Sequence, residues 1–221
     1  MISSAIIITL KLALVTTCLL LLVGTPLAWW LARTKWKGKP IVEALVTLPM
    51  ILPPTVLGFY LLLALGPHGP LGRVSLFLTG QTLAFTFVGL VIGSTIYSLP
   101  FVVQPLHNSF KSINPSLLEA AALMNASPLD RFISVVIPLA RPGFLTATIL
   151  GFSHTVGEFG VVLMIGGNIP GKTKVLSIAI YDYVENLEYA VAHGVSALLL
   201  LVSFLLLLIV FVVNKRSQVT P

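Results

Sequence analysis

The chain has 221 residues, of which 57% are hydrophobic and 9% are charged, and its mean hydropathy is +1.02. Because soluble domains carry about 25% charged residues, this composition excludes an ordinary soluble protein and leaves no room for a soluble catalytic domain. The formal net charge of +6 comes without a basic stripe interleaved with aromatic residues, so basic residues retained on the cytoplasmic side of a membrane explain it better than nucleic-acid binding. We expect an all-α membrane protein in which residues 1–221 form a single transmembrane domain.

About 20 apolar residues cross a bilayer as one helix, and by this measure the sequence predicts about five spans. They cover residues 12–31, 41–65, 83–103, 142–163 and 191–213. We expect Pro53 and Pro54 to interrupt the second span, because proline removes a backbone donor and breaks the helical ladder. Pro138 and Pro142 divide the region before the fourth span, which places an interfacial arm at 131–139.

The distribution of Lys and Arg orients these spans. Five spans place one set of basic residues on a single side: Arg33, Lys35, Lys37, Lys39, Lys111, Arg131, Lys215 and Arg216. The opposite side has only Arg73, Lys172 and Lys174 in its loops. Because cytoplasmic loops carry the excess of positive charge, we expect the N-terminus outside, the C-terminus in the cytoplasm, and a cytoplasmic element at 114–139.

A polar segment, NPSLLEAAALMNASPLD, begins this cytoplasmic element at Asn114 and ends at Asp130. Asn114 is a favourable N-cap residue, and Pro115 suits the first helical position. Asn125 stands where a left-handed residue would end the helix, and Ser127 begins a capping box with Asp130. The sequence therefore predicts a helix, a sharp turn and a second helix, which together form a docking element for a cytoplasmic partner.

The segment GGNIPGKT, from Gly166 to Thr173, matches the nucleotide-binding pattern GxxxxGK[ST] letter for letter. That mechanism needs a buried strand before the loop and a helix N-terminus after it. Here a membrane span precedes the loop, and the loop faces away from cytoplasmic ATP. We expect a tight external turn, so that any ATP is bound by a separate protein.

Glu158 lies within the predicted fourth span, where an ionisable side chain suggests a functional site. It either serves a gate or substrate path, or makes a structural hydrogen bond to a neighbouring helix near the external end. His154 precedes it by one helical turn, so it forms either a Glu–His pair or a satisfied contact between helices. Clusters of His, Glu and Asp with metal-ligand spacing are absent from the sequence, and we expect no bound metal.

Small residues continue along the same predicted span. Ser153 and Gly157 form a small-xxx-small pair, and Gly160 extends that face. This spacing permits close helix packing, either within the chain or between two copies.

The proline-rich second span predicts irregular backbone at membrane depth, which is tolerated mainly where it lines a cavity or is buried in protein. We therefore expect Pro53 and Pro54 to line a pore rather than only to kink the helix. Thr47 and Thr55 would offer neutral hydroxyl groups to a passing anion. The candidates for the pore or its gate are thus Thr47, Pro53, Pro54, Thr55, Ser153, His154, Gly157 and Glu158.

The polar segment resembles the EAA loop of binding-protein-dependent ABC importer permeases. The match consists of Glu119-Ala120-Ala121, three further residues and Asn125-Ala126, with Val135 and Ile137-Pro138 beyond them. The family pattern has Gly where this chain has Asn125, a mild departure because Asn tolerates the left-handed conformation. Two longer segments, LPMILPPTVLGFYLLLALG and GEFGVVLMIGGNIPGKT, resemble the molybdate/tungstate importer permeases. The likeness runs from about Leu12 to the C-terminus, and sulfate/thiosulfate importer permeases carry a similar GEFG or GEYG segment.

The resemblance implies a type I (MetI-like) importer permease fold in a bacterial or archaeal cytoplasmic (inner) membrane. It implies a homodimer in which each chain gives half of the pore, with two cytoplasmic ABC ATPase subunits below and an external oxyanion-binding protein above. The chain would bind no cofactor, because the ATPase subunits use the ATP. The residues that would contact the ATPase are Pro115, Leu118, Glu119, Ala120, Ala121, Met124, Asn125 and Ala126.

The implied cargo is a tetrahedral oxyanion, with molybdate or tungstate ahead of sulfate or thiosulfate. A different class of protein, a secondary transporter or channel that works alone, would transport without an ATPase. A membrane scaffold without a transport role fits poorly with the broken spans and with Glu158.

Overall fold

The computed structural model describes residues 2–217, with the side chains of residues 2–212, and within that range the chain is helical without a β-strand. Among the described residues, three helices are long and apolar enough to cross a membrane: α1 (Ile2–Arg33), α5 (Phe87–Ser112) and, by its residues Tyr189–Val212, α12 (Tyr189–Ser217). Two bent pairs bring the number of spans up to five if each pair counts as one. The predicted class, an all-α membrane protein with about five spans, is confirmed.

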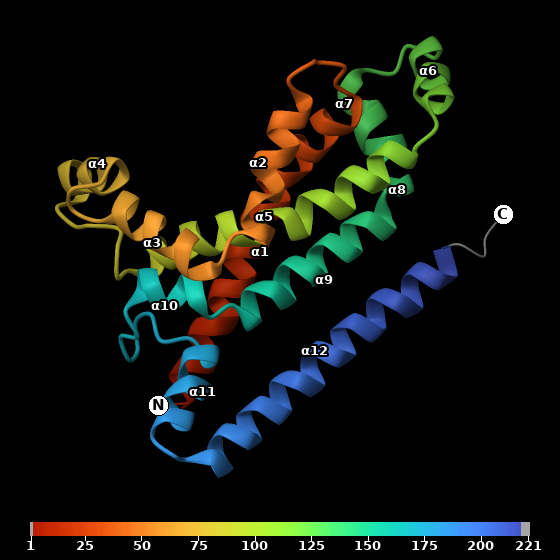
Figure 1. The fold of residues 1–221 in the computed structure, drawn as a ribbon. Helices are drawn as coiled ribbons and strands as arrows, with labels where there is room; N and C mark the ends of the chain where they lie inside the picture. The colour runs from red at the N-terminus through yellow and green to blue at the C-terminus, as the bar shows by residue number, and fades with distance from the viewer. Residues whose placement is uncertain (1, 218–221) are drawn as a thin grey trace.

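The core lies where α1, α5 and α9 (Arg141–Gly157) pack together, as seen at the centre of Figure 1. Small residues allow this approach. A Cβ atom added to Gly24 of α1 would lie 3.3 Å from Val102 of α5, and one added to Gly151 of α9 would lie 2.6 Å from the same side chain. Because lipid is as apolar as these helices, close packing of this kind contributes more to helix association than removal of apolar surface from water.

The predicted second span consists of α2 (Lys39–Ile51) and α3 (Pro54–Leu65), which are bent by 111°. The break falls at Leu52 and Pro53, whose backbone is extended. Pro54 then occupies the first turn of α3, where its missing N–H leaves no ladder bond unmade. The predicted interruption is present, and it turns α3 away to pack against α10 (Gly160–Gly166) and α5.

The predicted fourth span is interrupted as well, and this break was not expected. α9 ends at Gly157, Glu158 is extended with φ −65° and ψ 131°, and α10 begins at Gly160. The expectation of one continuous span at 142–163 is therefore wrong. The arm before it is also bent by 74° relative to α9, close to the predicted division at Pro138 and Pro142.

Several other boundaries differ from the expected ones. α1 begins near the N-terminus, and α5 begins a few residues later than expected and continues through Pro100 and Pro105 to Ser112. Two helices occupy segments in which none was predicted: α4 (Pro70–Thr79) and α11 (Leu176–Glu185). Each is a helix of ten residues that follows a loop rich in glycine and proline, and it is too short to be recognised as a membrane span from hydropathy.

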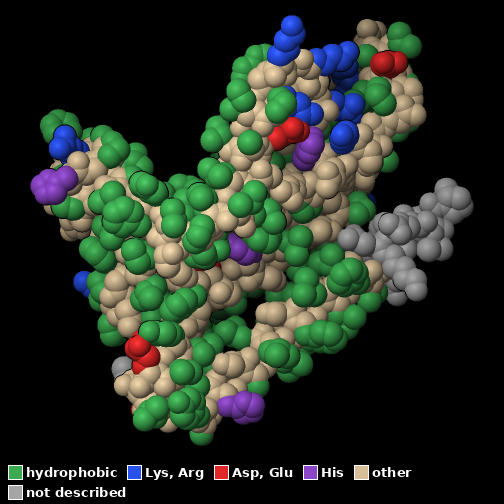
Figure 2. All heavy atoms as spheres, viewed as in Figure 1, with side chains coloured by type: hydrophobic (Ala, Val, Ile, Leu, Met, Phe, Trp, Pro, Cys, Tyr) green, Lys and Arg blue, Asp and Glu red, His purple; other side chains and the backbone are tan. Residues whose placement is uncertain are grey.

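The two ends of the molecule differ in charge. Figure 1 shows the loop between α1 and α2 at the same end as α6 (Pro115–Leu123) and α7 (Pro128–Arg131), while the N-terminus lies at the opposite end beside α11. In Figure 2 the Lys and Arg side chains gather mainly at the first end. This arrangement agrees with the predicted orientation. Lys215 and Arg216, which were counted in that prediction, lie outside the residues whose side chains are described.

The last helix, α12, runs beside α9 and α11 but is mostly separate from the core (Figure 1). Only 11% of its most apolar window is buried within the chain. Large apolar side chains such as Leu200 and Phe211, which are 72% and 70% exposed, therefore meet the surroundings of the protein in the membrane.

Candidate functional site

A cavity of about 530 Å³ opens beside the break in the fourth span. It is lined by residues of α3, α5, α9 and α10: Pro54, Thr55, Tyr97, Ser153, His154, Gly157, Glu158, Phe159 and Gly160. Six of the predicted pore or gate candidates thus meet at one place, although the second and fourth predicted spans are far apart in the sequence. None of the described lining residues is Lys or Arg, so the cavity holds no fixed cation that would bind an anion tightly.

His154 makes contacts between helices and forms no pair with Glu158 among the described residues. Its Nδ1 atom lies 2.9 Å from Ser98 Oγ on α5, and Ser98 Oγ lies 3.2 Å from Thr155 Oγ1. Its ring stacks on Phe101 at 3.9 Å between centroids and lies 4.8 Å from Tyr97. Of the two predicted alternatives, the structure has the satisfied contact between helices.

Glu158 is the most unusual side chain of the cavity. It is 3% exposed, and neither carboxyl oxygen makes a hydrogen bond of standard geometry within the described part of the chain. The buried hydroxyl of Ser94 on α5 nevertheless interacts with this carboxyl group. The structure is thus compatible with both predicted alternatives, the contact with a neighbouring helix and the gate or substrate path. A buried carboxyl group with so few partners is costly to maintain, which favours a functional role for it.

The backbone at the break is better satisfied than the Glu158 side chain. The Ser177 hydroxyl of α11 donates to the main-chain carbonyl of Glu158 at 2.5 Å. The Glu158 N–H reaches the Thr155 carbonyl at a long 3.4 Å. Non-helical backbone at membrane depth persists only where protein or water satisfies its hydrogen-bonding groups. Here the Ser177 hydroxyl of α11 satisfies the Glu158 carbonyl.

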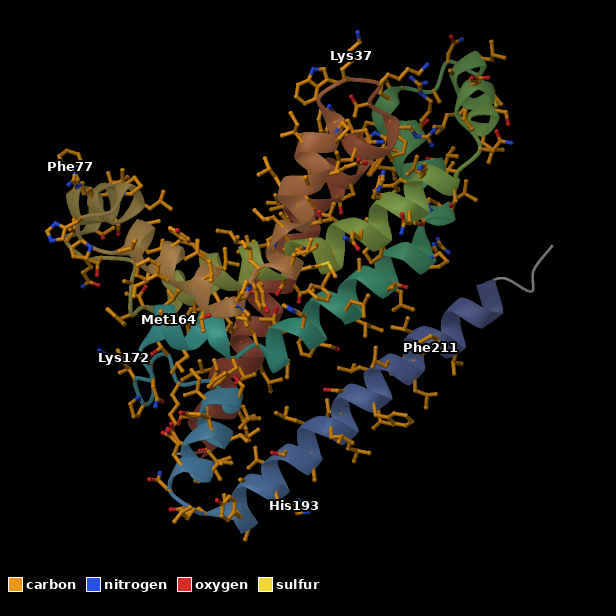
Figure 3. All side chains as sticks on the ribbon, in the orientation of Figure 1. Lys37, Phe77, Met164, Lys172, His193 and Phe211 are labelled. Carbon is orange, nitrogen blue, oxygen red and sulfur yellow. The ribbon has the colours of Figure 1, made fainter. Side chains whose placement is uncertain are left out.

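The small residues at the break differ in their surroundings. A Cβ atom added to Gly160 would lie 2.7 Å from Pro54 Cβ, and one added to Gly58 would lie 2.8 Å from Met164 Cβ. Figure 3 labels Met164 on α10. α3 and α10 therefore approach closely through glycine. A Cβ atom added to Gly157 would meet no described atom within 4 Å. Gly160 lies beyond the break, so it does not extend the face of Ser153 and Gly157 as predicted.

Two predicted pore candidates lie away from the cavity. Thr47 is inside α2, where its hydroxyl donates to the Glu43 carbonyl at 2.8 Å. Pro53 is exposed at the break between α2 and α3 and does not line the cavity. Both residues are close to the proline motif in the sequence. The bend between α2 and α3 nevertheless directs only α3 toward α10, so these two residues lie outside the cavity.

Sequence reasoning missed several residues of this region. Tyr97, Ser94 and Ser98 all come from α5, in which no pore residue was predicted. Ser94 and Ser98 are spaced i, i+4 in an apolar helix, and polar residues on one face of a span often indicate the interior of the bundle. Glu43 was also missed: its Oε1 lies 3.5 Å from Lys39 Nζ and 4.0 Å from His107 Nε2.

The segment with the nucleotide-binding pattern folds as a closed turn. A helix, α10, precedes it rather than a strand. The Thr173 hydroxyl donates to the Gly166 carbonyl at 2.6 Å and accepts from the Ile169 N–H at 3.1 Å. Asn168 Nδ2 and Lys174 Nζ both bind the Asp182 carboxylate of α11. These contacts occupy the hydroxyl of Thr173, which a nucleotide site would offer to magnesium. The match to the nucleotide-binding pattern is therefore explained by a turn that holds α11 in place.

The predicted docking element has the expected local structure. Asn114 Oδ1 accepts from the Ser116 N–H at 3.0 Å, and Ser127 Oγ accepts from the Asp130 N–H at 3.2 Å. Asn125 has φ +59° in the turn between α6 and α7. The predicted helix, turn and helix are confirmed, and φ > 0 explains why Gly or Asn is needed at this position.

The exposed surface of this element is partly apolar. Leu123 and Met124 are 87% and 83% exposed, which is unusual for large apolar side chains outside a bilayer. The residues predicted to contact the ATPase fall in two groups. Pro115, Glu119, Ala120, Met124 and Asn125 are exposed, whereas Leu118, Ala121 and Ala126 are half-buried.

An aromatic cluster lies beneath this surface and joins four helical segments. Trp29 of α1 lies 5.5 Å from Phe110 of α5 and 5.4 Å from Phe132 of the π-helical turn η1 (Phe132–Val136), measured between ring centroids. Phe110 lies 5.8 Å from Phe144 of α9. Leu118 packs against the same core. The remaining segment, α8 (Ile137–Leu139), connects η1 to α9. A displacement of α6 and α7 would thus reach α9 through close contacts.

No group of three or more potential metal ligands occurs among the described residues.

The chain is 60% identical to the molybdenum transport system permease protein ModB of Azotobacter vinelandii over 204 residues, which covers 92% of this chain and 90% of that protein. It is 36% identical to a probable sulfate transport system permease protein of Zygnema circumcarinatum, over 89% of this chain and 68% of that protein.

Among solved structures, a chain of the inward-facing MetNI methionine ABC transporter has a TM-score of 0.70 at 21% identity, covering 96% of this chain and 94% of that one. This likeness confirms the predicted type I permease fold. The sequence profile described as binding-protein-dependent transport system inner membrane component matches residues 24–218. The chain therefore belongs to this family of multi-pass inner membrane transport proteins.

Proposed function

We propose that this chain is the membrane-spanning subunit of an ATP-driven importer that carries molybdate into the cytoplasm of a bacterium or an archaeon. The observation that carries the proposal is the 60% identity to a molybdenum permease over nine-tenths of both chains. Tungstate is the second cargo of the same size and charge. Sulfate is less favoured, because the sulfate permease relative has 36% identity and is covered over only 68% of its length.

The lining of the cavity at the break in the fourth span suits the passage of an oxyanion better than its tight binding. Its described lining offers hydroxyl groups from Thr55, Tyr97 and Ser153 but no Lys or Arg. Conduction requires an anion to leave as well as to enter, and neutral donors meet that need better than fixed cations. Glu158 repels an anion when it is charged, so we assign it to the gate and not to cargo binding. A second copy of the chain would complete the pore, and selectivity would rest mostly with an external oxyanion-binding protein.

Energy would come from two cytoplasmic ATPase subunits, since the only segment of the described chain that resembles a nucleotide site is closed by its own Thr173. The exposed apolar side chains of Leu123 and Met124, with the exposed carboxylate of Glu119, form the contact surface for those subunits. ATP-driven closure of the subunits would move α6, and the aromatic cluster would transmit that motion to α9 and the break at Glu158.

Reconstitution tests the proposal directly. The chain, co-purified with an ABC ATPase subunit and supplied with an oxyanion-binding protein, should take up molybdate into proteoliposomes only when ATP is present on the cytoplasmic side. Uptake by the chain alone, without any ATPase, would instead establish a secondary transporter. Sulfate uptake that exceeds molybdate uptake at equal concentrations would move the assignment to the sulfate importers.

Two variants test the coupling surface. Glu119→Lys reverses an exposed charge on α6, and Ala121→Asp introduces a charge into its half-buried face. Both should abolish ATP-dependent uptake while the chain remains in the membrane. Lys172→Ala is the control, because Lys172 lies in the turn that resembles a nucleotide site and should be dispensable for ATP use. Normal uptake by both α6 variants would refute the assignment.

A further inference from the structure

A second cavity, of about 520 Å³, lies at the end of the molecule opposite α6. Its lining includes Ile7 and Lys11 of α1, Phe85 and Phe87 from the start of α5 and the loop before it, and Lys172 of the loop between α10 and α11. Figure 3 labels Lys172 on that loop. Both charged residues of the described lining are lysines, and no ion pair joins either of them to a carboxylate within residues 2–212. The cavity therefore has two positive charges available to an anionic ligand.

The depth of Lys11 in the membrane follows from helix geometry. At 1.5 Å per residue, the distance along α1 from Lys11 to Arg33 is about 33 Å, close to the ~30 Å thickness of a hydrocarbon core. The exposed Trp30 and Trp36, with Lys35 and Lys37 beside them, form the aromatic and basic boundary typical of one membrane surface. Lys11 then lies at the opposite surface, at the level of the lipid headgroups.

The side of α1 that carries Lys11 faces outward. Ile7 and Leu14, which flank Lys11 at helical spacing, are 64% and 58% exposed, and Leu22 further along the same side is 71% exposed. A face with this apolar exposure lies outside the core of the chain and is open to lipid. Lys11 thus combines an outward-facing position with headgroup depth.

The aromatic wall of the cavity is held in an unusual conformation. Phe85 has φ +61°, which is strained for a bulky residue, and its N–H donates to the Ile165 carbonyl at 2.9 Å. Its ring lies over Gly167, where an added Cβ atom would approach it to 2.7 Å. Phe87 receives the Lys11 ammonium group at 5.0 Å from its ring centroid. The loop therefore positions one aromatic ring beside the ammonium group and a second ring beside the cavity.

From these observations we infer that the cavity binds the phosphate of an anionic phospholipid of the outer leaflet, with Lys11 and Lys172 as its cationic partners. Ile7 and the phenylalanine rings would contact the glycerol and the first part of the acyl chains. A phosphodiester carries one negative charge and accepts hydrogen bonds from ammonium groups, whereas a zwitterionic headgroup adds a cation that the lysines would repel. Such a lipid would tie α1 to the loop that ends in α11. The inference is independent of the proposed cargo.

The test is the thermal midpoint, Tm, of the full-length chain in detergent, titrated with dioleoylphosphatidylglycerol or with dioleoylphosphatidylcholine. We expect the anionic lipid to raise Tm at a lower mole fraction than the zwitterionic lipid. Since a basic residue near a membrane surface contributes about fivefold to anionic lipid binding, Lys11→Gln and Lys172→Gln should each raise the half-saturating mole fraction about fivefold. The double variant should raise it about 25-fold. Arg73→Gln removes one exposed charge on the same predicted side and should leave it unchanged.

Three results would overturn the inference. The first is an unchanged half-saturating mole fraction in the double variant. The second is an equal loss in Arg73→Gln, which would indicate diffuse surface charge. The third is the same rise in Tm with millimolar sodium phosphate or sodium molybdate in lipid-free detergent, which would assign the cavity to a free oxyanion. If the Lys11 variants fail to fold, Lys172→Gln alone decides the outcome, because Lys172 is exposed in a loop.

Discussion

The Ser177 hydroxyl on α11 donates a hydrogen bond to the main-chain carbonyl of Glu158 at 2.5 Å, and this contact joins the outer helix α11 to the break in the fourth span. The same α11 is fastened at Asp182 by Asn168 and Lys174. A load placed on α11 from outside would therefore reach the cavity at Glu158 through one hydrogen bond. This connection relates the outer surface of the protein to the proposed gate.

Ser177→Ala should lower the stability of the chain. The change leaves a buried carbonyl without a partner, a loss that costs about 1–3 kcal/mol. We expect Tm in detergent to fall and ATP-dependent uptake to decrease with it. Ser116→Ala, which truncates an exposed serine of α6, should leave Tm unchanged. An identical Tm for both variants would show that water replaces the Ser177 hydroxyl.

Gly160→Ala and Gly157→Ala form a matched pair at the same break. The added methyl group at Gly160 would lie 2.7 Å from Pro54 Cβ, whereas at Gly157 it would enter open space. Overpacking costs about 1–3 kcal/mol, so Tm should fall for Gly160→Ala and not for Gly157→Ala. The measurement is thermal unfolding of both variants side by side. Equal sensitivity at the two positions would contradict the packing of α3 against α10.

The contact between Ser98 and His154 can be measured by a double-mutant cycle. Ser98→Ala and His154→Phe each remove one partner of the 2.9 Å contact. Because hydrogen bonds between membrane helices average about 0.6 kcal/mol, with a maximum of about 1.7, we expect a coupling energy of that order in equilibrium unfolding. Distant sites add independently, so His154→Phe combined with Ser75→Ala of α4 should show no coupling. A coupling energy of zero for the contacting pair would show that this hydrogen bond does not stabilise the protein in the membrane.

Glu158→Gln tests the proposed gate. Glutamine keeps the shape of the side chain but neither carries a negative charge nor exchanges a proton when the break opens to water. We expect uptake to fall about tenfold, within the range of coupling free energies between states, while Tm does not fall. Glu188→Gln, which changes an exposed carboxylate, should leave uptake intact. Wild-type uptake by Glu158→Gln would limit Glu158 to a structural role.

Asn125 lies at the turn of the proposed coupling element with φ +59°. Glycine adopts this conformation without cost, whereas a β-branched residue is strained there by about 1–3 kcal/mol. Asn125→Gly should therefore retain uptake, and Asn125→Val should weaken the coupling of ATP hydrolysis to uptake. The ratio of molybdate transported to ATP hydrolysed is the quantity to compare. An unchanged ratio in Asn125→Val would separate the turn from coupling.

The sequence predicted the features that depend on a few neighbouring residues. The span lengths follow from the hydropathy of about 20 consecutive residues, and the proline break before α3 follows from the missing N–H groups. The caps of α6 and α7 at Asn114 and Ser127 were predicted because a cap involves only residues two or three positions apart. The roles assigned to the pore and coupling residues remain predictions, which the experiments above address.

Other features could not be predicted from local sequence. The break at Glu158 and Phe159 contains no proline, and the glycines that flank it, Gly157 and Gly160, are also compatible with a continuous helix that packs closely against a neighbour. Only the contacts with α3 and α11 make an extended conformation acceptable there. That Thr47 lies away from this cavity has a related cause, since the size of the bend between α2 and α3 is a property of the packed helices.

By itself, the sequence determined that this is an all-α membrane protein, that most of its loop Lys and Arg residues lie at one end, and where the helix–turn–helix segment at 114–130 begins and turns. These properties arise from hydropathy, charge and capping, which act within one or two helical turns. Only the tertiary structure decided that Ser98 meets His154 across 56 positions and that Ser177 meets Glu158 across 19. Such contacts depend on how whole helices pack, and packing is set by the shapes of many side chains at once rather than by any local pattern.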